Sequence, residues 1–77
     1  MKNPLKKIKE EKDLTLEEFA LVADVSQSTI YKNIQGSNKK INLDILRACE
    51  KMGYLPEKIE RQYQDFKEYK KRELLKR

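Results

Sequence analysis

The sequence predicts an all-α domain built from five helices. Apolar residues make up 38% of the 77 residues and recur at helical spacing over most of the chain. Polar caps with hydrophobic staples mark three helix starts, and each of the two prolines stands where another helix would begin. A chain this short has little core, so it forms one small domain or half of a dimeric one.

The first two helices are predicted from their start signals. Asn3 is expected to cap a helix over about residues 4–12, with a proline at its first position. The second helix, about residues 16–23, begins with a capping box formed by Thr15 and Glu18. Hydrophobic residues on both sides of this cap complete a staple, which makes this the clearest helix start in the sequence.

The third and fourth helices are each bounded by a polar cap and a glycine. Ser26 is the expected N-cap of the third helix, and Gly36 is its left-handed C-cap. A largely polar loop over residues 37–41 leads to Asn42, which caps the fourth helix, and Gly53 closes that helix. The side chains of the fourth helix expected to face the core are Ile45, Leu46, Cys49 and Met52.

The fifth helix is the longest, and Pro56 opens it. Acidic residues lie early in this helix and basic residues lie late, which matches the helix dipole. Spacings of four and three residues place one apolar stripe along it. The members of this stripe are Leu55, Ile59, Tyr63 and Phe66.

Charge is concentrated at the two ends of the chain. The net charge of +5 divides into +3 over residues 1–12, +4 over residues 67–77 and −2 over residues 13–66. Basic ends of this kind suit a polyanionic surface, above all a phosphate backbone.

The composition excludes several function classes. The chain has no histidine, one cysteine and two glycines, so a histidine base, a four-cysteine zinc site and a glycine-rich phosphate loop are all excluded. We therefore expect no enzyme activity, no metal, no cofactor and no small-molecule ligand. The longest apolar run is too short to cross a membrane, and the amino terminus lacks a secretory signal. These features predict a cytoplasmic protein without a membrane partner.

The second and third helices form the most informative unit of the sequence. Ala20 is small enough for two helices to cross closely, and Asp24 tolerates the left-handed turn between them. The stretch Leu5–Tyr54 resembles the phage repressor and Cro type (Xre-type) helix-turn-helix family. The resemblance rests on the strings L-T-L-E-E-F-A-L-V-A-D-V-S-Q-S-T-I-Y-K-N-I-Q-G and I-N-L-D-I-L-R-A-C-E-K-M-G-Y.

This resemblance implies a phage-repressor-like fold with a DNA-binding function. Residues 1–55 would be the helix-turn-helix domain, with residues 27–35 as the recognition helix. Residues 56–77 would add an amphipathic helix with a basic tail to the same domain. Family members read bases from the first, second and sixth positions of the recognition helix, here Gln27, Ser28 and Lys32. Contacts to the DNA backbone, or flanking the bases, are implied for Ser26, Thr29, Tyr31, Ser37, Asn38, Lys39 and Lys40.

Three departures from the family pattern stand out. Leu16 occupies a position where a glutamine often contacts phosphate. Lys9 and Ile34 occupy positions where many members have an arginine–glutamate pair, so Ile34 is expected to fill space instead. Asn33 stands where an apolar residue is common, and it must find hydrogen-bond partners or turn to solvent.

The C-terminal helix has two open interpretations. Its stripe either completes the core of the domain or forms a dimer contact through Ile59, Tyr63 and Phe66, and both are possible together. Its basic tail, residues 67–77, either binds DNA phosphates or frays into solvent.

The predicted function is sequence-specific regulation of transcription. We expect a Cro-like repressor from a phage or mobile element, acting as a homodimer that occludes a pseudopalindromic operator in double-stranded DNA. The alternative is a protein-interaction module, such as a phage antirepressor or adaptor that uses the C-terminal helix.

Overall fold

The computed structural model describes the whole chain, residues 1–77. It contains five helices and no strand, which confirms the predicted all-α class. None of these helices is both long enough and apolar enough to span a bilayer. The helices are α1 (Pro4–Glu11), α2 (Leu16–Ala23), α3 (Gln27–Gln35), α4 (Leu43–Lys51) and α5 (Pro56–Leu75).

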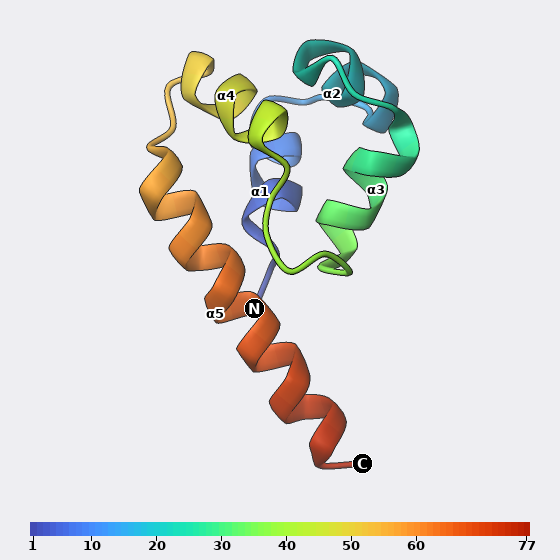
Figure 1. The fold of residues 1–77 in the computed structure, drawn as a ribbon, viewed down its shortest axis with the longest axis vertical. Coiled ribbons are helices and arrows are strands. Elements are labelled where there is room, and N and C mark those ends of the chain that lie inside the picture. Colours follow the sequence, from blue (N-terminus) through green and yellow to red (C-terminus); the bar gives the residue numbers. More distant parts are fainter.

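The first four helices form the body of the molecule, and α5 extends past it (Figure 1). α1 lies in the middle, where it packs against both α3 and α5, and α2 packs against α3 and α4. The N-terminal half of α5 lies along this body, whereas its C-terminal half projects away from it. This projection stretches the molecule to 37 Å in its longest dimension against 23 and 21 Å in the other two.

Local chemistry fixes the α2–α3 unit. Thr15 Oγ1 accepts a hydrogen bond from the Glu18 N–H at 3.0 Å, and Glu18 Oε1 accepts one from the Thr15 N–H at 2.9 Å. The bond from the Thr15 N–H to the carboxylate favours its ionised form and lowers the pKa of Glu18. Asp24 then adopts the left-handed conformation, with φ of 57°. The next residue, Val25, donates its N–H to the Ala20 carbonyl and so closes the turn. The chain therefore reverses into α3 within a short turn.

One core holds all five helices together. Cys49 lies in it as a packed apolar side chain, and burial raises the pKa of its thiol to about 11. The thiol consequently stays protonated at neutral pH. Met52, predicted to face the core, is half-buried and packs against it, and the buried Ala48 is a further member of the core. The core residues are Leu5, Ile8, Phe19, Ala20, Ala23, Ile30, Ile41, Ile45, Leu46, Ala48, Cys49, Ile59 and Tyr63.

Candidate nucleic-acid interface

The exposed face of α3 presents unpaired polar side chains to solvent, at its N-terminal end and at Lys32 in its last turn. Ser26 caps the helix, because its Oγ accepts a hydrogen bond from the Thr29 N–H at 3.2 Å and lies 2.9 Å from the Thr29 Oγ1. Gln27, Ser28 and Lys32 are exposed, and none of them forms a side-chain hydrogen bond within the chain. Ser28 and Lys32 lie four residues apart and so share one face of the helix. These side chains are available to an external partner.

The C-terminal end of α3 is tied to three other segments through Asn33, whose side chain is only 2% exposed. Asn33 Nδ2 donates to Asn38 Oδ1 at 2.6 Å, and Asn33 Oδ1 accepts from the Asn42 N–H at 2.8 Å. The Asn33 backbone carbonyl accepts from Asn3 Nδ2 at 2.9 Å. The partners required of a buried amide at this position are therefore present. They fix α3 relative to α1, to the α3–α4 loop and to the start of α4.

A polar depression joins the exposed face of α3 to the α3–α4 loop. Its volume is about 330 Å³, and none of its lining residues is apolar. Lys32 from α3 and Lys40 from the loop both line it, so two positive charges meet at a concave polar surface. Such a surface suits an anionic group. The lining residues are Thr29, Lys32, Asn33, Asn38, Lys40 and Asn42.

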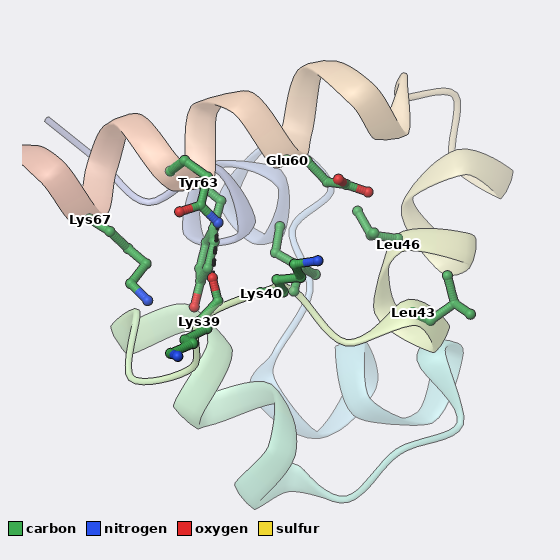
Figure 2. A pocket seen from close by; sticks show the side chains of 9 residues that line it. Lys39, Lys40, Leu43, Leu46, Glu60, Tyr63 and Lys67 are labelled. Atoms are coloured by element: carbon green, nitrogen blue, oxygen red, sulfur yellow. Dashed lines mark hydrogen bonds between the residues drawn. The ribbon is translucent and has the colours of Figure 1, made fainter.

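α5 supports the same loop from its other side. Tyr63 Oη donates to the Asn38 carbonyl at 2.7 Å, and Gln64 Nε2 donates to the Lys39 carbonyl at 2.9 Å. Figure 2 shows Tyr63 extending from α5 toward the loop that holds Lys39 and Lys40. Lys40 lines both the polar depression and a groove of about 670 Å³ between α4, α5 and the loop, whereas Lys39 lines only the groove. The loop thus lies between two hollows with its lysines at both.

A family model described as Helix-turn-helix matches residues 5–52. The chain belongs to the Xre-type helix-turn-helix family. It is therefore a DNA-binding regulator of the Xre/Cro type. The match runs from α1 to the end of α4, and α5 lies outside it. No curated protein and no solved structure matches the chain.

In this helix-turn-helix, three residues that the resemblance implied as DNA-backbone or flanking contacts also form hydrogen bonds within the chain. Thr29 is half-buried, and its hydroxyl pairs with the cap at Ser26. Tyr31 is half exposed, and its hydroxyl accepts from Gln35 Nε2 at 2.7 Å, which directs the ring along the helix. The exposed Ser37 follows Gly36, the C-cap of α3, and its N–H donates to the Lys32 carbonyl at 3.0 Å. Their placement leaves the Tyr31 ring and the Ser37 side chain open to solvent.

The sequence left open whether Ile59, Tyr63 and Phe66 of the fifth helix complete the core or form a dimer contact. Ile59 and Tyr63 are buried in the core of the single chain, so neither side chain is available to a partner copy. Phe66 is half-buried and packs over Gly36, where an added Cβ would lie 3.0 Å from the Phe66 ring. Ile59 and Tyr63 thus complete the domain's own core, which was the other interpretation of the sequence, whereas Leu55 of the predicted stripe is 70% exposed.

Two further departures now have structural explanations. Leu16 is half-buried and packs against the core of the helix-turn-helix, so hydrophobic packing replaces a phosphate contact there. Ile34 packs against the same core, as expected for a residue that fills space. The basic tail is helical as far as Leu75.

Sequence reasoning missed the side chains of α5 that hold the loop and the end of α3. Tyr63 was assigned to the apolar stripe as a core or dimer-contact residue, Lys67 was placed only in the basic tail, and Gln64 was not singled out. Lys70, which donates to the Gln35 carbonyl at 3.0 Å, was placed only in the basic tail. Lys67 and Lys70, three residues apart beside the stripe, were the available signal for these contacts. Cations favour the C-terminal end of a helix, and here that helix is the neighbouring α3.

Proposed function

We propose that this helix-turn-helix protein is a Cro-like transcriptional repressor of phage or mobile-element type, which binds a pseudopalindromic operator as a homodimer. The N-terminal end of α3 enters the major groove, and the α3–α4 loop binds the adjacent phosphates. Repression follows from occlusion, because the bound dimer covers a promoter.

The polar depression that joins Lys32 to Lys40 is the observation that supports this proposal most strongly. It places a side chain suited to base edges next to one suited to phosphates, on one continuous surface. Gln27 pairs bidentately with adenine, Lys32 donates to guanine O6 and N7, and Ser28 accepts or donates to several bases. All three are exposed and unpaired within the chain. The remaining backbone contacts are assigned to Ser26, Thr29, Tyr31, Ser37, Asn38 and Lys39.

Selection of bound duplexes from a random library, at physiological salt and read by sequencing, tests the proposal. The expected result is an enriched pseudopalindrome with half-sites about 34 Å apart, one helical turn. The double variant Gln27→Ala/Lys32→Ala should lose this enrichment. Lys58→Ala, which removes an exposed lysine of α5 near α1 and the α4–α5 junction, is the matched control and should retain it.

Other results of the selection are informative. A single unpaired half-site would retain the DNA-binding regulator and contradict the homodimer, as would monomeric sedimentation both free and on DNA. Absence of any enrichment would contradict sequence-specific regulation.

The alternative function is that of an antirepressor or adaptor that binds a protein through α5. The observation in its favour is that Leu74 and Leu75, at the projecting end of α5, are 52% and 74% exposed. A duplex affinity that is negligible at both low and high salt would support this alternative.

A further inference from the structure

Few backbone N–H groups of the α3–α4 loop have a hydrogen-bond partner within the chain. The Ser37 N–H donates to the Lys32 carbonyl, and the Asn42 N–H donates to Asn33 Oδ1. Between these two residues, no backbone N–H of the loop has a partner within the chain. The conformation of residues 38–41 is therefore set by contacts that other elements make, not by a turn of its own.

α5 supplies these contacts from one short stretch of helix. The Asn38 carbonyl accepts two hydrogen bonds, from Tyr63 Oη at 2.7 Å and from Lys67 Nζ at 2.7 Å. The next carbonyl along the chain, that of Lys39, accepts from Gln64 Nε2 at 2.9 Å. Donors at positions 63, 64 and 67 thus hold two consecutive carbonyls of the loop.

Tyr63 is the most rigid of the three donors. Its side chain is 0% exposed, so its ring is held by the core, whereas Gln64 is exposed and keeps its rotamer freedom. Lys67 Nζ also lies 5.8 Å from the centre of the Tyr63 ring, which joins the two donors in one cluster. Burial raises the pKa of the Tyr63 phenol, so the hydroxyl remains a donor throughout the physiological range.

The same loop residue is also held from the recognition helix. Asn38 Oδ1 accepts from Asn33 Nδ2 at 2.6 Å, while its carbonyl accepts from α5. Asn38 is therefore fixed between α3 and α5, immediately before the two lysines that the loop presents. The position of those lysines relative to α3 depends on both sets of bonds.

We propose that Tyr63 is a positioning residue for DNA binding: its hydroxyl, through the Asn38 carbonyl, holds Lys39 and Lys40 at the phosphates while α3 reads the bases. This inference rests on the proposed function. It assigns to α5, which lies outside the family match, a direct part in the affinity for DNA. The position of Tyr63 does not affect which bases are read.

Tyr63→Phe tests the proposal, since it removes the hydroxyl and retains the buried ring. Duplex affinity should fall about three- to tenfold, equally for the selected operator and for a scrambled duplex. In a Lys39→Ala/Lys40→Ala background, the same substitution should change affinity less than twofold, because the groups it positions are absent. The ¹⁵N order parameters of residues 38–40 should fall below the value of about 0.85 typical of rigid backbone, with those of α4 unchanged.

Two further variants complete the experiment. Tyr54→Phe is the matched control, because it removes a tyrosine hydroxyl that lies 3.4 Å from Glu11, on α1, and should leave affinity unchanged. Gln64→Ala removes the neighbouring loop bond from an exposed position and should weaken binding in the same way but less. It serves as the test if Tyr63→Phe does not give the wild-type circular dichroism spectrum.

The outcomes separate this inference from the proposed function. If the wild-type chain does not bind duplex DNA, the proposed function fails and the inference fails with it. If the wild-type chain binds and Tyr63→Phe binds equally well, only the inference is overturned. A loss that persists undiminished in the Lys39→Ala/Lys40→Ala background, or one without change in loop order parameters, also overturns it, because the hydroxyl would then act elsewhere.

Discussion

The two ends of α3 differ in how far the rest of the chain constrains them. At the N-terminal end, Gln27 and Ser28 are exposed without a partner in the chain, as is Lys32 on the exposed face of the last turn. At the C-terminal end, Asn33 is bonded to the loop and to the start of α4, and the Gln35 carbonyl accepts from Lys70. One end is free to bind, and the other is held in place by its neighbours.

This difference separates recognition from positioning along one short helix. Side chains that read bases must be unpaired in the free protein, because a bond within the chain would compete with the bond to DNA. The backbone that carries them must be rigid, so that their ordering costs little on binding. In this helix-turn-helix, the rigidity comes from buried asparagines in the body and from donors on α5.

Loss of the Asn33 side chain, which holds the C-terminal end of α3, should have the largest effect on stability. Asn33→Ala leaves the Asn42 N–H and Asn38 Oδ1 without their partner in a partly buried site. The free energy of unfolding should fall by about 2–3 kcal/mol, measured by urea denaturation. Lys32→Ala, one residue earlier on the exposed face, should stay within about 0.5 kcal/mol of wild type. Equal losses for both variants would contradict the contrast between the two ends.

Loss of a side chain on the exposed face of α3 should act on recognition instead. Lys32→Ala should cost about 1–3 kcal/mol of binding to the selected operator and relax the preference at one base position. Affinity for a scrambled duplex should fall much less, because no base contact is lost there. Competition titrations against operators changed at single positions measure this. A uniform loss across all duplexes would show that Lys32 contacts the backbone.

Loss of a loop lysine should have the smallest effect and the least dependence on sequence. Lys39→Ala should weaken operator and scrambled duplexes alike by a few fold. It should also reduce the slope of log affinity against log salt by about 0.9 for each bound protomer. Titrations at several salt concentrations provide the slope. A loss confined to the operator would contradict the division of roles between loop and helix.

Local features of this fold were predictable from sequence, and long-range ones were not. The capping box at Thr15 and the left-handed glycine at Gly36 depend on residues within one helical turn, so their spacing alone identifies them. The unusual Asn33 indicated that partners must exist, but not that Asn38 and Asn42 would supply them. The bond from Tyr63 to residue 38 joins positions 25 apart, and periodicity assigns a tyrosine in an apolar stripe to packing alone.

In the candidate site, too, local features were predictable from sequence and long-range contacts were not. The resemblance predicted the candidate base-reading positions of α3, because these residues lie in one continuous stretch of the sequence. Burial of Ile59 and Tyr63 within one chain, rather than between two, depends on how α5 lies across the body. An amphipathic stripe has the same periodicity in both cases.

The most direct test is the affinity of the wild-type chain for duplex DNA at 50 and 200 mM salt. The two loop lysines neutralise two phosphates per protomer, so the slope should be about −1.8 per protomer and about −3.6 for a dimer. Between these concentrations, affinity should therefore fall about 12-fold for a bound monomer and about 150-fold for a dimer. A fall of this size would support DNA binding through the surface formed by α3 and its loop. A duplex affinity that is negligible, or that changes less than twofold, would contradict it.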